Sequence, residues 1–103
     1  MTQIADSIQI RNTTFKNRLI KGAMSEALAN DAGQPNQLHL GLYEAWAIGG
    51  LGCAITGNVM VDIRAKNEPG VVVAESERDL VELKKWADIG KQYGMVSVSY
   101  THL

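Results

Sequence analysis

Apolar side chains recur every three or four positions in two stretches of the chain, which is the spacing of one buried face of a helix. The first stretch follows Asn36, a residue type that caps helix N-termini, and stops at Gly49. The second follows Ser76, which has an acidic residue three positions later, and stops at Gly94. We therefore predict two amphipathic helices. Their inward stripes are Leu38, Leu42, Ala45 and Trp46 in the first, and Leu80, Leu83, Trp86 and Ala87 in the second.

Three short apolar stretches alternate with these helices and predict strands. Residues 18–23 precede the first helix, residues 51–56 lie between the helices, and residues 95–100 follow the second. The middle stretch is apolar at nearly every position, which is typical of a strand buried on both faces of a parallel sheet. An alternating segment at residues 8–15 predicts a lead-in hairpin. The element order is therefore that of an α/β fold.

The loops after the predicted strands are longer than those after the helices. Residues 24–35 follow the first strand, and residues 58–74, with a brief extended piece at 71–73, follow the second. In α/β folds the loops at the C-terminal ends of parallel strands carry the binding and catalytic groups. The strand spacing suits either a doubly wound sheet or a barrel, so periodicity alone leaves both open.

Composition and charge exclude several classes of protein. The chain has 103 residues, of which 46% are hydrophobic and 20% charged, as in an ordinary folded domain. The formal net charge is −1 and no basic block is present, so we expect no nucleic-acid partner. The apolar runs are far shorter than the ~20 residues that cross a bilayer. Because the first nine residues do not resemble a secretory signal, we expect no membrane partner and a cytoplasmic location.

The residues that could carry metal or thiol chemistry are few. Cys53 is the single cysteine and lies inside an apolar stretch, so we expect a buried core residue and no internal disulfide. His39 begins a helix without a partner at ligand spacing, and we expect it on the surface. The run Glu75, Glu77 and Asp79 is interpreted as a solvated helix entrance. No metal site is therefore expected.

The glycines at residues 49–52 do not form a nucleotide-binding motif. They precede a predicted strand instead of following one, they do not complete G-x-G-x-x-G, and no Gly-Lys-Ser or Gly-Lys-Thr occurs in the chain. We interpret them as a tight turn from helix to strand. This counts against a stand-alone doubly wound nucleotide binder.

Three ordered segments resemble the old yellow enzyme family, the flavin-dependent NADH:flavin oxidoreductases and ene-reductases. FKNRLIKGAMS at residues 15–25 is similar to the family's first strand and the small-residue and Met turn beneath the flavin. LYEAWAIGGLG at residues 42–52 is similar to its Y-E-x-x-A-x-G-G-x-G helix and turn. TGNVMVD at residues 56–62 is similar to the loop after its second strand. The resemblance extends from about residue 8 to residue 98.

The resemblance implies an α/β fold made of the first three βα units of a (β/α)8 TIM barrel, with residues 1–103 as the N-terminal part of a single FMN-binding domain. It implies FMN at the C-terminal ends of the strands and NADH or NADPH as reductant. Hydride would pass through FMN to an electrophilic small-molecule substrate such as an activated alkene. The residues that the resemblance places at the cofactor are Gly22, Ala23, Met24, Ser25 and Asn58.

The types of these residues suit a flavin. Gly22 and Ala23 would let the backbone approach a flat, largely apolar ring, and Met24 would be a polarizable contact to it. Ser25 and Asn58 carry donors for the polar edge of the ring, where a donor tunes the reduction potential. Taken singly, each also has a plain structural interpretation as strand-end packing, a loop residue or a turn former.

The length of 103 residues is less than half of the ~250 residues of a closed barrel. We expect no catalytic residue here, because the family's substrate-activating pair and phosphate-binding loops belong to later strands. Tyr100 replaces the Gln of the family's Q-L-x-H-x-G-R, and His102 is out of register with its His, so neither receives a role. We expect an incomplete, marginally folded and inactive barrel segment with little FMN affinity, and self-association of the full-length protein stays open. The alternative is a small self-associating α/β module without flavin.

Overall fold

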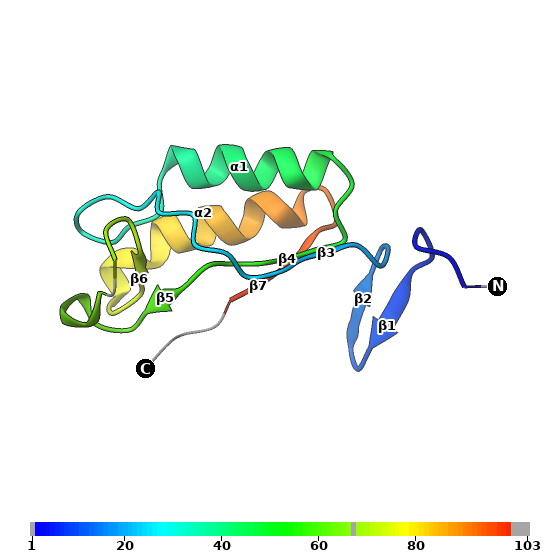
Figure 1. The fold of residues 1–103 in the computed structure, drawn as a ribbon, viewed down its shortest axis with the longest axis horizontal. Coiled ribbons are helices and arrows are strands. Elements are labelled where there is room, and N and C mark those ends of the chain that lie inside the picture. The colour runs from blue at the N-terminus through cyan, green and yellow to red at the C-terminus, as the bar shows by residue number, and fades with distance from the viewer. Residues whose placement is uncertain (1, 67, 100–103) are drawn as a thin grey trace.

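The computed structural model describes residues 2–66 and 68–99 (Figure 1). The predicted strands at 18–23, 51–56 and 95–100 are present as shorter strands, and Tyr100 and His102 lie outside the described residues. The strands are β1 Ile8–Ile10, β2 Thr13–Phe15, β3 Ile20–Lys21, β4 Cys53–Ile55, β5 Val59–Met60, β6 Val72–Val73 and β7 Val96–Val98. The helices are α1 Gln37–Ile48 and α2 Leu80–Lys91, with short 3-10 turns η1 Ile63–Ala65 and η2 Glu77–Asp79.

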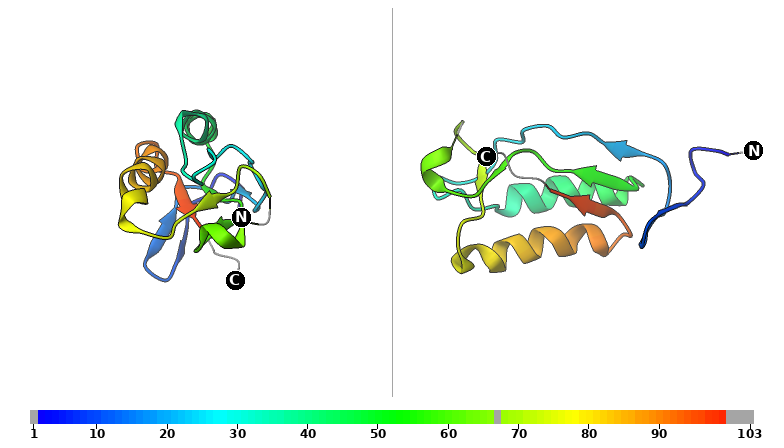
Figure 2. Two further views of the ribbon diagram at one scale, coloured as in Figure 1. Left: turned by 90° about the vertical axis from the view of Figure 1, so that its left-hand side faces the viewer. Right: turned by 90° about the horizontal axis from the view of Figure 1, so that it is seen from below.

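The central sheet is parallel, and its strands follow chain order as β3-β4-β7. Ile20 pairs with Cys53, which pairs in turn with Val96. Both helices lie on one face of this sheet and pack against each other (Figures 1 and 2). This is the arrangement expected of successive βα units, and the described residues form no closed barrel.

The two faces of the central sheet differ in what covers them. The helix face carries Lys21, Ala54 and Ser97, which are neighbours across the three strands. Ala54 is fully buried in the main core with Tyr43, Ala47, Trp86 and Met95. Because side chains alternate along a strand, Ile20 and Val98 point to the opposite face. They are 55% and 41% exposed, so the described elements leave that face partly open.

The segment at residues 58–74 is more ordered than the sequence predicts. β5 and β6 form a parallel pair in which Val59 lies opposite Val72, and η1 lies between the two strands in the sequence. The expected extended piece at 71–73 is confirmed, but its partner strand was missed. Strands of two residues are too short to show periodicity, and their pairing depends on contacts distant in sequence.

The buried face of each helix differs from the predicted stripe. In α1 the buried residues are His39, Tyr43 and Ala47, whereas Leu38 is 62% exposed. The true inward face is therefore rotated by one residue from Leu38, Leu42 and Trp46. The reason is that Tyr43 packs edge-on against the ring of Trp86, with centroids 5.2 Å apart. In α2 Trp86 is buried as predicted, but Leu80 is exposed.

His39 is fully buried, and the expectation that it lies on the surface is wrong. Its Nδ1 accepts a hydrogen bond from the backbone N–H of Asn36 at 3.3 Å, so it completes a capping box with the predicted N-cap. Its ring packs 5.0 Å from that of Trp86. The histidine is buried because the cap uses one ring nitrogen and an aromatic neighbour covers the ring.

Acidification is expected to destabilise the fold partly through His39. Burial lowers the pKa of His39 from its usual 6.5, so the unfolded chain takes up this proton first as the pH falls. The stabilising contribution is present above pH 6.5 and is lost below it, by at most about 1.4 kcal/mol per pH unit. His39→Gln keeps an acceptor for the capping box and removes this titration. Urea unfolding between pH 7 and pH 5 should show a shallower loss of stability in the variant, and equal slopes would refute this.

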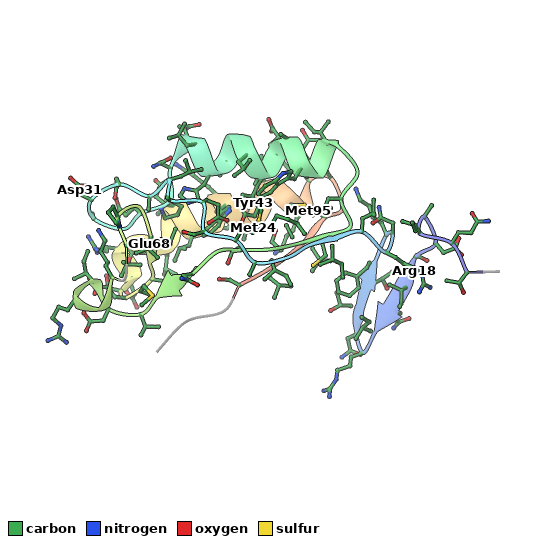
Figure 3. The ribbon with its side chains drawn as sticks, viewed as in Figure 1. Arg18, Met24, Asp31, Tyr43, Glu68 and Met95 are labelled. Carbon is green, nitrogen blue, oxygen red and sulfur yellow. The ribbon has the colours of Figure 1, made fainter. Side chains whose placement is uncertain are left out.

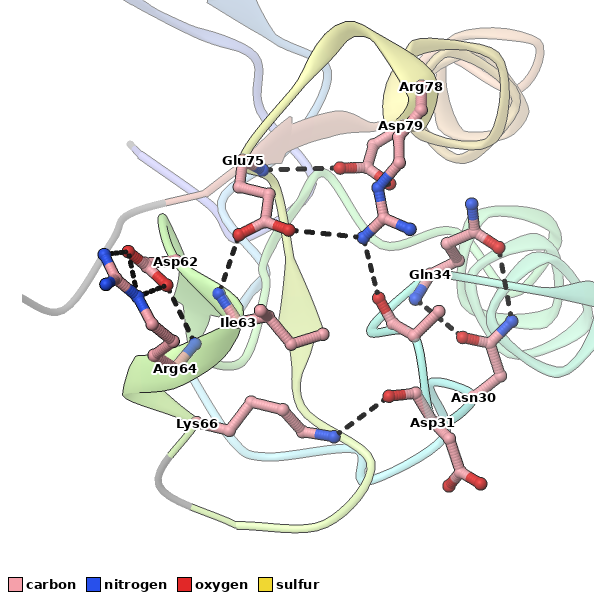
Figure 4. A network of polar contacts seen from close by, with 11 residues as sticks. Asn30, Asp31, Gln34, Asp62, Ile63, Arg64, Lys66, Glu75, Arg78 and Asp79 are labelled. Carbon is pink, nitrogen blue, oxygen red and sulfur yellow. Dashed lines mark hydrogen bonds and ion pairs between the residues drawn. The ribbon is translucent and has the colours of Figure 1, made fainter.

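The acidic run before α2 is not uniformly solvated, because Asp79 is fully buried. Its Oδ2 accepts from the Glu75 backbone N–H at 3.3 Å, and its Oδ1 lies 3.5 Å from Arg78 Nε (Figure 4). Glu75 in turn accepts from the backbone N–H of Ile63 at 2.8 Å. The side chain of Ser76 makes no capping hydrogen bond, and η2 precedes α2. The run therefore joins the entrance of α2 to the β5–β6 segment, which corrects the prediction for Asp79.

Candidate functional site

The loops that leave the central strands meet at one edge of the sheet. β3 leads into residues 22–25, and β4 leads into Thr56, Gly57 and Asn58. The Thr56 hydroxyl lies 2.9 Å from that of Ser99, which follows β7, and the Thr56 backbone N–H donates to the Val98 carbonyl at 2.8 Å. The C-terminal ends of the three strands thus form one continuous rim, where parallel sheets place their functional loops.

Gly57 brings the loop after β3 into direct contact with the loop after β4. A Cβ atom at this position would lie 2.5 Å from the Met24 carbonyl oxygen and 3.0 Å from the Ser25 Cα. Only a residue without a side chain fits there. The close approach brings the predicted residues 22–25 to the same rim as Asn58.

The predicted cofactor residues form an accessible surface on this rim. Gly22, Ala23, Met24 and Ser25 are all exposed, and Asn58 is half-buried. Met24, which is labelled in Figure 3, is 61% exposed. A Cβ atom at Gly22 would meet no other atom within 4 Å. The backbone at Gly22 is therefore open to a flat group. The thioether of Met24 and the amide of Asn58 lie on the two neighbouring loops. These residues fit the face and polar edge of a flavin ring.

Ser25 is already engaged by the chain. Its hydroxyl donates to the carboxylate of Glu68, in the segment between η1 and β6. The backbone N–H of Ala29 also donates to the Gly70 carbonyl at 2.9 Å, and Lys66 Nζ donates to the Asp31 carbonyl at 3.4 Å, so several contacts fasten the loop after β3 to this segment. A Ser25 hydroxyl that donates to a flavin would have to leave Glu68.

Glu26 is a member of the site that the sequence did not single out. Its Oε2 accepts a hydrogen bond from the Tyr43 hydroxyl and one from the Gly57 backbone N–H, the latter at 3.2 Å. One carboxylate therefore joins the loop after β3, helix α1 and the loop after β4. The signal available in the sequence was only a glutamate next to the predicted cofactor residues, together with a tyrosine on a helix.

Burial shifts the ionisation of the groups behind the rim. The Lys21 Nζ is buried 4.9 Å from the centroid of the Trp46 ring, and burial lowers the pKa of Lys21 while Glu26 partly offsets this. Burial, and then the hydrogen bond to Glu26, raise the pKa of Tyr43 above its usual range. Burial also raises the pKa of the Cys53 thiol, and its buried position confirms it as a core residue.

Other kinds of site are less well supported in the described part of the chain. No group of three or more His, Cys, Asp or Glu side chains in residues 2–66 and 68–99 could hold a metal ion. Among these residues, no helix is both long and apolar enough to cross a membrane. A cavity of about 450 Å³ lies beside α2 and β7, lined by Leu83, Trp86 and Val98 among others. It contains none of the predicted cofactor residues.

Sequence comparison with known proteins finds relatives that are named NADH-dependent flavin oxidoreductases. The chain is 36% identical over 85 residues to the NADH-dependent flavin oxidoreductase iliE of Hypocrea jecorina, a match that covers 79% of this chain and 21% of that protein. No protein-family model matches the chain. The chain thus spans about a fifth of the length of this relative.

Solved structures share the fold. The old yellow enzyme homologue from Zymomonas mobilis superposes with a TM-score of 0.85 at 15% identity, over 95% of this chain and 27% of that one. A 2-naphthoyl-CoA reductase in complex with 2-naphthoyl-CoA superposes with a TM-score of 0.89 at 24% identity, over 95% and 15%. The predicted fold class, a part of an old yellow enzyme TIM barrel, and the resemblance to that family are confirmed. The roles of Gly22, Ala23, Met24, Ser25 and Asn58 stay predictions.

Proposed function

We propose that the chain supplies three successive βα units to an FMN-dependent oxidoreductase of the old yellow enzyme type. The enzyme would take hydride from NADH or NADPH and pass it to an electrophilic small molecule such as an activated alkene. The observation that carries the proposal is the exposed rim where residues 22–25 meet Asn58 through Gly57. The relative in Hypocrea jecorina, named as an NADH-dependent flavin oxidoreductase, supports the same chemistry.

Each residue of the rim has a binding or orienting role in this proposal. The rim would hold FMN, which would supply hydride transfer between the nicotinamide and the acceptor. Gly22 and Ala23 leave room for the ring to lie against backbone, and Met24 adds a polarizable contact. Asn58 offers a donor to the polar edge, where negative charge gathers on reduction, and Ser25 offers a second once its hydroxyl leaves Glu68. No described residue is assigned to substrate activation.

The experiment that tests the proposal is a hybrid enzyme. The residues of the Hypocrea jecorina oxidoreductase that match this chain are replaced by those of this chain, and the product is purified beside the unmodified enzyme. We expect the hybrid to retain FMN and to oxidise NADH in the presence of an enone under anaerobic conditions. A folded hybrid without flavin, with the unmodified enzyme fully loaded, would contradict the proposal.

The 103-residue chain by itself is expected to bind FMN weakly and to show no NADH oxidation. Its central sheet leaves Ile20 and Val98 exposed on the face opposite the helices, so the rim has little support from that side. A titration of FMN fluorescence against the purified chain measures this directly. Tight one-to-one binding with turnover would show that the rim needs no further strands.

The same exposed face favours a second candidate, a self-associating α/β module without flavin. Burial of Ile20 and Val98 between two copies would stabilise such a dimer. This candidate predicts a stable dimer in sedimentation and cooperative melting in calorimetry. It also predicts that the hybrid enzyme lacks FMN, which distinguishes it from the flavin proposal.

A further inference from the structure

A single carboxylate connects three elements behind the rim. Glu26 lies directly after the exposed residues 22–25, and its Oε2 accepts from both the Tyr43 hydroxyl and the Gly57 backbone N–H. Tyr43 belongs to α1, and Gly57 belongs to the loop after β4. Hydrogen bonds to an ionised carboxylate are stronger than those between neutral groups. Glu26 is thus well suited to fix the position of one loop relative to the other.

Tyr43 is a rigid anchor for this carboxylate. Its side chain is fully buried, and its ring lies 5.0 Å from that of Trp46 and 5.2 Å from that of Trp86, both in edge-on contacts. A buried phenol packed between two rings has little freedom to move. The Glu26 carboxylate that accepts its hydrogen bond is therefore tied to the core and not only to another loop.

The side chains around Glu26 and the packing at Gly57 also favour a fixed position for this part of the loop. The negative charge of Glu26 partly offsets the effect of burial on the pKa of Lys21 and of His39, so both side chains lie close enough to interact with it. A Cβ atom at Gly57 would lie 2.7 Å from Glu26 Oε1 and 2.5 Å from the Met24 carbonyl oxygen. Met24, Ser25 and Glu26 are consequently held in van der Waals contact with the loop after β4.

We infer that Glu26 is a positioning residue, whose shared hydrogen bonds to Tyr43 and Gly57 hold Met24 and Ser25 in place at the rim. The consequence for flavin rests on the proposed function. The carboxylate is half-buried and used by two donors within the chain, so Glu26 acts through its neighbours and does not itself contact the cofactor. Loss of the carboxylate would remove the hydrogen bond that ties this loop to Gly57, next to Asn58, and leave Ser25 held through Glu68.

The first test measures the hydrogen bond between the Gly57 backbone N–H and Glu26 in the full chain, without flavin. In a ¹⁵N–¹H spectrum the Gly57 amide should shift in Glu26→Gln, and its hydrogen exchange should accelerate about tenfold, since a charged acceptor is lost. Glu26→Ala should show a larger acceleration that extends to residues 22–25. Glu44→Ala, which removes a glutamate from α1 outside the loop, is the matched control. An unchanged Gly57 amide in Glu26→Gln would overturn the inference.

The second test uses the hybrid enzyme and separates this inference from the proposed function. Glu26→Gln should weaken FMN binding about tenfold and change the flavin reduction potential, while Glu44→Ala changes neither. If the hybrid binds FMN and Glu26→Gln alters neither affinity nor potential, the positioning role is wrong and the flavin proposal stands. If the hybrid lacks FMN but Glu26→Gln shifts the Gly57 amide, the proposed function fails and the contact between the loops is upheld.

Discussion

Gly57→Ala is expected to destabilise the fold and to weaken FMN binding by the hybrid enzyme about a hundredfold. The added methyl group would lie 2.5 Å from the Met24 carbonyl oxygen and 3.0 Å from the Ser25 Cα, so the loop after β3 must move away from the rim. Overpacking of this kind costs about 1–3 kcal/mol. Urea unfolding measures the stability, and a fluorescence titration measures FMN affinity.

Gly22→Ala is the matched control for this variant. It adds the same methyl group to the facing loop, after β3, but that methyl group meets no other atom within 4 Å. The entropic effect of replacing glycine on the unfolded chain is similar in both variants, so it cancels in the comparison. We expect Gly22→Ala to change the stability by no more than about 0.5 kcal/mol. Equal urea midpoints for the two variants would show that the loops do not meet at Gly57.

Tyr43→Ala is expected to have the largest effect on stability, a loss of about 3–5 kcal/mol. Tyr43 is fully buried in the main core, and its truncation removes contacts with both Trp46 and Trp86. Native proteins have free energies of unfolding of about 5–15 kcal/mol, so this loss is a large fraction of the total. Circular dichroism during urea unfolding is the direct measurement.

Tyr43→Phe separates the hydroxyl from the packing of the ring. This variant keeps the aromatic contacts and removes the donor to Glu26, with an expected cost of about 1–3 kcal/mol. We expect the core to stay folded while exchange at the Gly57 amide increases. A loss of stability equal to that of Tyr43→Ala would mean that the hydroxyl, and not the packed ring, dominates at this position.

The parts of the fold that the sequence predicted are those set by local patterns. The caps at Asn36 and Gly49 bound α1 correctly, and the continuous apolar run gave β4 in the centre of the sheet. The burial of His39 and Asp79 was missed because polar side chains are expected outside unless partners cover them. For His39 that partner, Trp86, comes from a distant position. The groups that contact Asp79, the Glu75 backbone N–H and Arg78, are near it in sequence, but no sequence pattern showed that they would meet it.

The same distinction applies to the candidate site. Residues 22–25 and Asn58 were found through their resemblance to known motifs, and the structure places them on one rim through Gly57. Glu26 was missed because its two donors lie 17 and 31 residues away, on a helix and on another loop. The engagement of Ser25 by Glu68 was missed for the same reason, since 43 residues separate them.

We propose that the flavin ring lies against the open backbone at Gly22, and the affinity of the hybrid enzyme for FMN is the decisive measurement. Gly22→Val fills space that no chain atom occupies within 4 Å, so the protein should tolerate it while a flat ring should not. We predict unchanged thermal stability of the FMN-free hybrid and FMN binding weakened about a hundredfold. An unchanged dissociation constant in Gly22→Val would contradict this placement of the cofactor.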